Sequence, residues 1–352
     1  MRNVLAAAAR ALPTWRAVLD VALFAVPLGT ALCVLGRWTT VDLPILVAAT
    51  GFVPVAVVVA AITTVLAIVM RRRLAAVSGA LCLLATAAVV VPRFTVGQDG
   101  APAGEPLTVV TANVHFRGDD VAGAVDAVTS TRADIVALQE VTPDFAAALA
   151  PRAAAAGYRW TVVKAAWGST GLAVLSRVPV VGHRDLAVAG QPLLQVDVAV
   201  AGVVLRLHDV HIEAPVSRSA VRRWRDQLEA LRRLLDERGG GPVIAAGDFN
   251  ATVDHLPFRR LLGGGRKDAV VERRRWLPTW PAGRRLVPSL LPLDHVVVSD
   301  GLAAAAARTA LCPGSDHRML IASLVVVAAP EGRRPARREG LSDQRPTPIT
   351  IR

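Results

Sequence analysis

The chain has 352 residues, 53% of them hydrophobic, with a mean hydropathy of +0.44 and a formal net charge of +12. The charge is uneven: residues 1–93 carry 8 basic and 2 acidic side chains, residues 94–330 carry 26 and 23, and residues 331–352 carry 6 and 3. A domain that binds duplex nucleic acid shows a concentrated basic surface, so the nearly balanced central region argues against nucleic acid as a partner.

The first part of the chain holds three apolar runs in which charged residues are almost absent, at 18–36, 43–70 and 74–91. A helix of about 20 apolar residues crosses the hydrocarbon core of a bilayer, and each run is that long or nearly so. Arginines precede the first run, as they do in a cleaved signal peptide, but two further apolar runs argue against that alternative. The sequence therefore predicts a membrane domain at residues 1–93 with three transmembrane helices.

Positive charges differ between the two sides of these helices. Three arginines precede the first helix and three more connect the second to the third, whereas only Arg37 lies between the first and the second. Because basic residues are concentrated in cytoplasmic loops, the N-terminus is expected in the cytoplasm. Three spans then place everything after Arg93 outside the cell membrane, as an extracytoplasmic domain.

The remainder divides into a linker, a large domain and a tail. Gly, Pro and polar residues at 94–106 predict the linker, and Pro, Arg and Glu at 328–352 predict a disordered basic tail. Residues 107–327 are numerous enough to bury a substantial core. They contain one cysteine, Cys312, so packing must hold this core without a disulfide inside the domain.

Apolar runs and a helical period alternate within residues 107–327. Short apolar runs bounded by turn residues predict strands, at 107–112, 135–138, 158–163, 172–175, 193–201, 203–210, 243–246, 295–298 and 319–327. Residues 219–237 repeat apolar side chains at the helical period and predict an amphipathic helix. The pattern indicates an α/β domain.

Polar residues recur where six of these strands end or begin: at Asn113, at Glu140, at His211, at Asp248 with Asn250, at Asp294, and at Asp316 with His317. One polar strand end is ordinary for a turn, but six predict a polar cluster at one edge of the sheets. Carboxylate and amide oxygens suit Mg²⁺ or Mn²⁺, whereas zinc favours histidine and cysteine. Two alternatives stay open: His208 competes with His211, and His115 competes with Asn113.

This ordered series of motifs closely resembles the endonuclease/exonuclease/phosphatase family, the metal-dependent phosphohydrolases related to DNase I, over about residues 107–327. The resemblance implies a four-layer α/β sandwich, in which two packed mixed sheets are flanked by helices. It also implies a metal site and a catalytic set: Asn113, Glu140 and Asp316 for the metal, Asp248 and Asn250 for orienting water and phosphate, His211 for contacting the phosphate, and Asp294 for orienting His317.

These roles fit the chemistry of a phosphate ester, whose negative charge repels nucleophiles. A divalent ion held by Glu140 and Asn113 would neutralise charge on the phosphoryl oxygens. Asp248 would activate water for in-line attack. His317, held by Asp294, would stabilise the phosphoryl group or supply a proton.

Four short segments, HIEAP, DFNATVDH, TWP and GSDHR, resemble the actinomycete membrane phosphohydrolases associated with teicoplanin resistance. That resemblance implies a lipid (prenyl) pyrophosphate as substrate, although Ile212 and Glu213 stand where prolines or small residues are expected. The alternatives are an extracellular DNase I-like nuclease and a sphingomyelinase-like phospholipase, whereas a non-enzymatic docking module would require the polar cluster to be incidental. The membrane tether and the balanced charge favour a lipid over DNA. Asp254 and His255 either cap a helix or line the substrate site, and the oligomeric state stays open.

Overall fold

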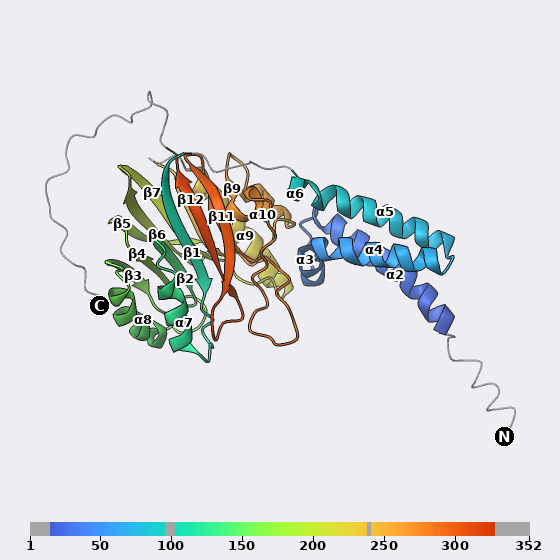
Figure 1. The fold of residues 1–352 in the computed structure, drawn as a ribbon, viewed down its shortest axis with the longest axis horizontal. Helices are drawn as coiled ribbons and strands as arrows, with labels where there is room; N and C mark the ends of the chain where they lie inside the picture. The colour runs from blue at the N-terminus through green and yellow to red at the C-terminus, as the bar shows by residue number, and fades with distance from the viewer. Residues whose placement is uncertain (1–14, 96–102, 238–240, 328–352) are drawn as a thin grey trace, which may run out of the picture. The chain divides into compact units, whose positions relative to one another are not determined.

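The computed structural model describes residues 15–95, 103–237 and 241–327 (Figure 1). The chain forms two compact units, one of residues 1–95 with 254–256 and one of residues 96–253 with 257–352. We call the first the helical unit and the second the sheet unit. The predicted tail at 328–352 and residues 96–102 of the predicted linker lie outside the described residues.

The described part of the helical unit consists of α2 (Trp15–Gly36), α3 (Pro44–Gly51), α4 (Val53–Val69), α5 (Arg73–Val90) and α6 (Pro92–Thr95). One continuous stretch, Arg73–Thr95, has 23 residues and is long and apolar enough to cross a membrane. Helices α3 and α4 pass the same test as a pair, but the chain bends by 74° between them. The apolar part of α2, Val21–Gly36, is shorter.

The described residues therefore contain one candidate span, or two if the bent pair counts as one, rather than three clear spans. The second apolar run is broken because Gly51 ends α3 and Pro54 stands in the first turn of α4. Proline lacks the N–H that would continue a helix, so a new helix begins there. Length and composition alone give weak support for membrane association.

The sheet unit contains two six-stranded mixed sheets. The first has the order β11-β12-β1-β2-β4-β3: β11 (Leu302–Leu311), β12 (Arg318–Val326), β1 (Glu105–Asn113), β2 (Ile135–Gln139), β4 (Leu172–Ser176) and β3 (Trp160–Lys164). The second has the order β5-β6-β7-β8-β10-β9: β5 (Val180–Val188), β6 (Gln191–Val200), β7 (Val203–His211), β8 (Val243–Asp248), β10 (Asp294–Val298) and β9 (Lys267–Asp268). The parallel pairs are β1 with β2 and β7 with β8, and the other pairs are antiparallel.

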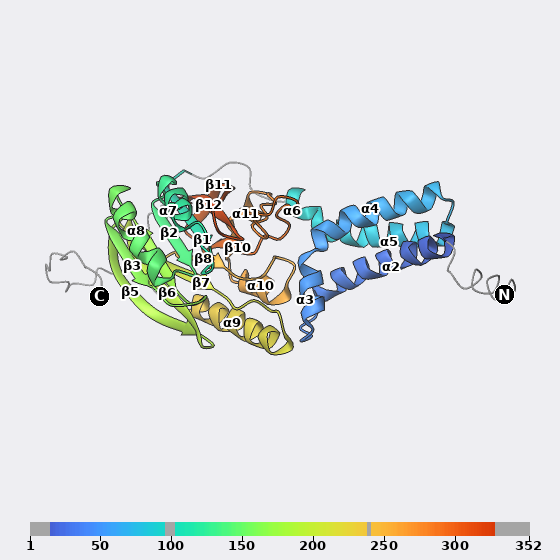
Figure 2. The same cartoon turned by 90° about the horizontal axis from the view of Figure 1, so that it is seen from below.

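Helices cover the outer faces of the sheets, which confirms the predicted α/β sandwich. Apolar residues of α7 (Val121–Ser130) and α8 (Pro143–Ala155) form a core with the outer face of the first sheet. Helix α9 (Arg218–Asp236) lies along the second sheet (Figure 2) and corresponds to the helix predicted at 219–237. Two short helices, α10 (Leu256–Leu261) and α11 (Ala269–Glu272), follow.

Several elements were not predicted from the sequence. Strand β11 is mostly alanine, a residue that is depleted in strands, and it forms a strand because it pairs along its length with β12. Strand β5 alternates exposed and half-buried residues at the edge of the second sheet. Strand β1 begins at Glu105, inside the predicted linker.

The inner faces of the two sheets share one apolar core that becomes polar at one end. Alternate residues of the central strands fill this core, including Leu107, Val109, Ile135, Ala137, Leu205, Leu207, Ile244 and Ala246. Side chains on one face of a strand recur every second residue. The same faces therefore continue into Asn113 on β1, Gln139 on β2, His211 on β7 and Asp248 on β8.

Gly247 allows β8 to lie against β7 just before the polar end of the sheets. A Cβ atom at this position would lie 1.8 Å from the carbonyl oxygen of Val210, which is backbone and cannot turn aside. We expect Gly247→Ala to lower the melting temperature by about 5–10 °C, equivalent to about 3 kcal/mol. Gly182→Ala is the matched control, because its nearest neighbour is 3.9 Å away. Equal melting temperatures for the two variants, measured by thermal unfolding, would contradict this explanation.

Candidate active site

Polar residues close the inner faces of both sheets at one end of the sheet unit. In the second sheet His211, Asp248 and Asp294 occupy opposed positions on β7, β8 and β10. Strand β1 of the first sheet ends at Asn113. The amide nitrogen of Asn113 joins the two sheets, because it donates to Asp248 Oδ2 at 3.1 Å and to Glu140 Oε1 at 3.0 Å.

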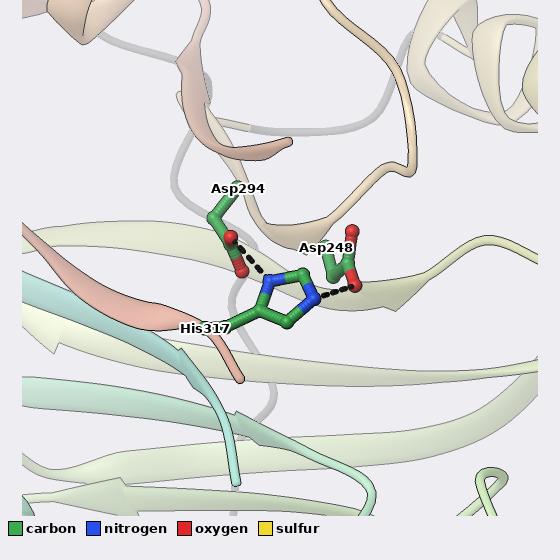
Figure 3. A group of neighbouring side chains, drawn as sticks. All are labelled: Asp248, Asp294 and His317. Carbon is green, nitrogen blue, oxygen red and sulfur yellow. Dashed lines mark hydrogen bonds and ion pairs between the residues drawn. The ribbon is translucent and has the colours of Figure 1, made fainter. Parts of the chain in front are cut away.

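His317 lies between two buried carboxylates, as Figure 3 shows. Its Nδ1 donates to Asp294 Oδ2 at 2.8 Å, and its Nε2 lies 3.6 Å from Asp248 Oδ2. Burial lowers the pKa of His317, but the charges of Asp294 and Asp248 outweigh this effect and raise the pKa to about 10. His317 is therefore an imidazolium at neutral pH and can donate a proton.

His211 is oriented by a backbone carbonyl. Its Nδ1 lies 2.8 Å from the carbonyl oxygen of Ser169, which can only accept, so Nδ1 carries the proton. Its Nε2 lies 3.6 Å from Glu140 Oε1 and 3.9 Å from Asp248 Oδ2. The competing residue, His208, is on the opposite face of β7, where burial lowers its pKa to about 3. The histidine at the site is therefore His211.

The segment Gly-Asp-Phe-Asn holds two polar groups by anchoring the residue between them. Phe249 is fully buried, and its ring packs edge-on against Phe258. The backbone N–H of Asn250 donates to Asp248 Oδ1 at 2.8 Å, and the side-chain nitrogen of Asn250 donates to the carbonyl of Ile212 at 2.8 Å. Asp248 and Asn250 are thus fixed in orientation.

Three residues at this end have left-handed backbone although none is glycine: His115 (φ 57°), Glu140 (φ 63°) and Asn250 (φ 45°). Such conformations cost about 1–3 kcal/mol each. The conformation of Glu140 is held by its side chain, since the N–H of Phe116 donates to Glu140 Oε2 at 2.9 Å. Arg132, Ala189, Ala201 and Arg274 of the same unit also have positive φ, so backbone strain alone does not mark the site.

A family model described as the Endonuclease/Exonuclease/phosphatase family matches residues 110–317, more than half of the chain. The chain belongs to this family. Its members are hydrolases that act on phosphoester bonds and depend on a divalent metal. The match covers Asn113 through His317 and therefore every predicted site residue.

Solved structures share the fold of the sheet unit. An endonuclease/exonuclease/phosphatase from Beutenbergia cavernae is 23% identical over 64% of this chain and 73% of that chain, with a TM-score of 0.54. Humanized D. rerio TDP2, altered by 14 mutations, is 19% identical over 62% and 98%, with a TM-score of 0.53. Truncated Caenorhabditis elegans TDP2 is 18% identical over 62% and 97%, with a TM-score of 0.51. A comparison with curated proteins finds no match.

The site residues of this family member fit a divalent cation. Glu140, Asp248 and Asp294 bring three carboxylates into a buried region in which His317 supplies one positive charge. Burial raises the pKa of Asp248, although the charge of His317 opposes the increase. Asp294 Oδ1 is buried and has no hydrogen-bond partner among the described residues. A bound cation would relieve this excess of negative charge.

Three side chains that could together hold a metal ion also contact one another. Ligand atoms of Asp248, Asp294 and His317 lie within 4.8 Å of one another. His317 Nδ1 donates to Asp294 Oδ2 at 2.8 Å, so that nitrogen is engaged by a carboxylate. Glu140 is then the nearby carboxylate left to hold a cation, with one oxygen of Asp248.

The other two predicted metal ligands are engaged differently. Asn113 presents its amide nitrogen to the carboxylates, while its Oδ1 accepts from the N–H of His115 at 2.9 Å. The side chain of Asp316, next to His317 in the sequence, makes another contact: its Oδ2 accepts from Trp280 Nε1 at 3.2 Å, and the side chain is 37% exposed. Metal binding by Asn113 and Asp316 stays a prediction.

Two hydroxyl groups that sequence reasoning missed hold residues of the candidate site in place. Ser315 Oγ donates to the carbonyl of Asn113 at 2.7 Å and accepts from the N–H of His317 at 3.0 Å. Thr279 Oγ1 accepts from the N–H of Asp294 at 3.3 Å. The position of Ser315, two residues before His317, is a local signal for such a turn. Thr279 begins the TWP segment noted in the sequence, but the pattern did not predict its hydrogen bond to Asp294.

A second polar layer lies next to the catalytic residues. Thr111 Oγ1 donates to Gln139 Oε1 at 3.2 Å, and Gln139 Nε2 donates to Asp209 Oδ1 at 2.6 Å. Since Gln139 is on β2 and Asp209 is on β7, these bonds join the two sheets. Burial raises the pKa of Asp209 well above its ordinary value, and Asp209 Oδ2 has no hydrogen-bond partner among the described residues.

We expect Asp209→Asn to raise the melting temperature at pH 8 more than at pH 4. Above about pH 4 the unfolded aspartate loses its proton while the folded one keeps it, so the wild-type protein loses stability as pH rises toward the folded pKa. Asparagine keeps an oxygen for Gln139 and does not titrate. The test is thermal unfolding of both proteins at the two pH values, and an equal difference at both would contradict the neutral state of Asp209.

Proposed function

We propose that this protein is a membrane-anchored, extracytoplasmic, Mg²⁺-dependent phosphohydrolase that acts on a lipid (prenyl) pyrophosphate. The proposal combines the phosphohydrolase site with the apolar helices of the same chain. It includes the predicted three spans, with the bent pair α3 and α4 as the second, and membership of the actinomycete subgroup associated with teicoplanin resistance.

The exposed apolar surface of the helical unit carries this proposal. Leu28 on α2 is 64% exposed, Ile62 on α4 is 56% exposed and Leu81 on α5 is 62% exposed. Large apolar side chains exposed along several helices are unfavourable in water but have a suitable solvent in a bilayer. The arginine pattern of the sequence supports an extracytoplasmic sheet unit.

The short connection supports a substrate held in the same membrane. Only residues 96–104 separate α6 from β1. Even a fully extended segment of this length reaches about 35 Å, so the catalytic domain stays near the bilayer surface. A phosphate or pyrophosphate on a lipid is concentrated there, whereas soluble DNA is not.

The side chains of the site can perform in-line attack of water on phosphorus. Asp248, whose pKa burial raises, accepts the proton of a water that Asn250 helps to orient. His211 presents Nε2 toward the same site, and His317 donates a hydrogen bond to a phosphoryl oxygen or a proton to the leaving oxygen. Glu140 would hold a divalent ion, which would neutralise charge on the phosphoryl oxygens.

Two residues depart from the subgroup's pattern, Ile212 and Glu213, and neither adds an unpaired charge to the site. Ile212 is fully buried. Glu213 accepts from Arg223 at 2.6 Å and 2.7 Å, and this pairing lowers the pKa of Glu213. The negative charge of Glu213 is therefore engaged on α9, which is compatible with an anionic substrate at the site.

The test uses the detergent-solubilised full-length protein and measures phosphate released from farnesyl pyrophosphate, phosphocholine released from sphingomyelin, and nicking of plasmid DNA, each with Mg²⁺ and with EDTA. The proposal expects release from the prenyl pyrophosphate that EDTA abolishes. His317→Ala is expected to remove this activity. Efficient cleavage of plasmid DNA with farnesyl pyrophosphate left intact would establish the nuclease alternative, and cleavage of sphingomyelin alone would establish the phospholipase.

A further inference from the structure

The most exposed apolar side chains of the sheet unit lie in loops at the catalytic end. Leu286 is 91% exposed, Val216 is 81% exposed and Trp167 is 73% exposed. Single exposed apolar residues are common on soluble proteins, but these three all lie at one end of the unit. The other large apolar residues exposed in the described part of this unit are Val287 and Leu311, at the same end, and Val181 and Val204, at the opposite end of the strands.

Each of the three loops is attached to the active site by a hydrogen bond. The loop with Trp167 provides the Ser169 carbonyl that orients His211. The loop with Val216 follows Ile212, whose carbonyl accepts from Asn250. In the loop with Leu286, the N–H of Ala282 donates to the carbonyl of Asp316 at 2.7 Å. The apolar side chains therefore belong to loops that are hydrogen-bonded to residues of the candidate site.

Positive charge accompanies these apolar residues. Arg284 and Arg285 directly precede Leu286, and Arg218 follows Val216 by two positions; all three arginines are exposed. The acidic residue of the same loops, Glu213, is paired with Arg223 on α9. Apolar side chains combined with arginines are typical of surfaces that enter the interface of an anionic bilayer, because the side chains reach the acyl boundary while the arginines bind headgroups.

We propose that these three loops dock on the surface of an anionic lipid bilayer through Trp167, Val216 and Leu286. The active site then opens at the level of the lipid headgroups, where a phosphate attached to a lipid lies. The proposal rests on the proposed function, because docking on a bilayer helps catalysis only if the substrate is a lipid. The contact with the bilayer has its own readout.

Fluorescence quenching measures that contact without measuring activity. The full-length protein is placed in nanodiscs of phosphatidylcholine and phosphatidylglycerol, with its native cysteines replaced and a fluorophore attached through Leu286→Cys. The matched control carries the fluorophore through Val204→Cys, an exposed position at the opposite end of the strands. Quenching by spin-labelled lipid is expected to be severalfold stronger at position 286 than at 204. Equal quenching would overturn the proposal.

Kinetics measure what the contact does for the enzyme. The triple variant Trp167→Ser, Val216→Ser and Leu286→Ser is expected to lower kcat/KM for a prenyl pyrophosphate in nanodiscs about tenfold and to leave hydrolysis of a water-soluble pyrophosphate unchanged. The double variant Val181→Ser and Val204→Ser should change neither. Equal activity of the triple variant and the wild type on the bilayer substrate would overturn the proposal while leaving the proposed function intact. Quenching at position 286 without hydrolysis of any lipid would instead reject the proposed function and support the docking surface.

Discussion

Asp248→Asn is expected to lower kcat by about 10³–10⁴-fold. The substitution keeps the shape of the side chain but removes the group that accepts a proton from water. It also removes the carboxylate that lies 3.6 Å from His317 Nε2. Because burial raises the pKa of Asp248, its charge is unfavourable in the folded protein, and the melting temperature of the variant should equal or exceed that of the wild type.

The measurement is initial-rate kinetics on whichever of farnesyl pyrophosphate, sphingomyelin and plasmid DNA the protein hydrolyses, together with thermal unfolding of both proteins. Asp226→Asn is the matched control, since Asp226 is an exposed aspartate on α9, and its rate should match the wild type. A loss of rate below tenfold would show that Asp248 does not activate the nucleophile. A large loss accompanied by an equally large loss of stability would make the effect structural.

Glu140→Gln is expected to lower activity by about 10²–10⁴-fold and to remove the response of the protein to Mg²⁺ or Mn²⁺. Glutamine can still accept from Phe116 and contact Asn113, but it lacks the negative charge that a divalent cation requires. The melting temperature of the wild type should rise when Mn²⁺ is added, as expected for a ligand that binds the folded state. The variant should show no such rise.

Glu105→Gln controls for the loss of a carboxylate, because Glu105 is exposed at the start of β1. It should keep both the activity and the Mn²⁺-dependent rise. Activity of Glu140→Gln that persists in EDTA would contradict a metal-dependent mechanism. A retained Mn²⁺-dependent rise with lost activity would place the ion elsewhere in the chain.

The position of most site residues at one end of the sheets was predictable because Asn113, Glu140, His211 and Asp248 lie at or just after the ends of apolar strands. Val243 to Ala246 read as a buried strand, and the period of two then places Asp248 on the core-facing side at its end. The Ala201-Gly202 hairpin was predictable for a similar local reason, since both residues adopt positive φ, 49° and 78°, in the tight turn.

Contacts between distant segments were not predictable, because they depend on how the two sheets pack. Asn113 and Asp248 are 135 residues apart, and their hydrogen bond requires the first sheet to face the second in this register. Choosing between His208 and His211 requires knowing which face of β7 points into the core. The bend between α3 and α4 likewise depends on where the helix breaks within an apolar run that contains Gly51 and Pro54.

Hydrolysis of farnesyl pyrophosphate in ¹⁸O-labelled water tests the central claim, that these residues direct water to phosphorus. Prenyl pyrophosphates can also break at the carbon–oxygen bond, which would send the label to the alcohol. The account predicts that ¹⁸O enters a phosphate product in a reaction that requires Mg²⁺ and is lost in Asp248→Asn. Label in farnesol, or label in phosphate that Asp248→Asn does not reduce, would contradict it.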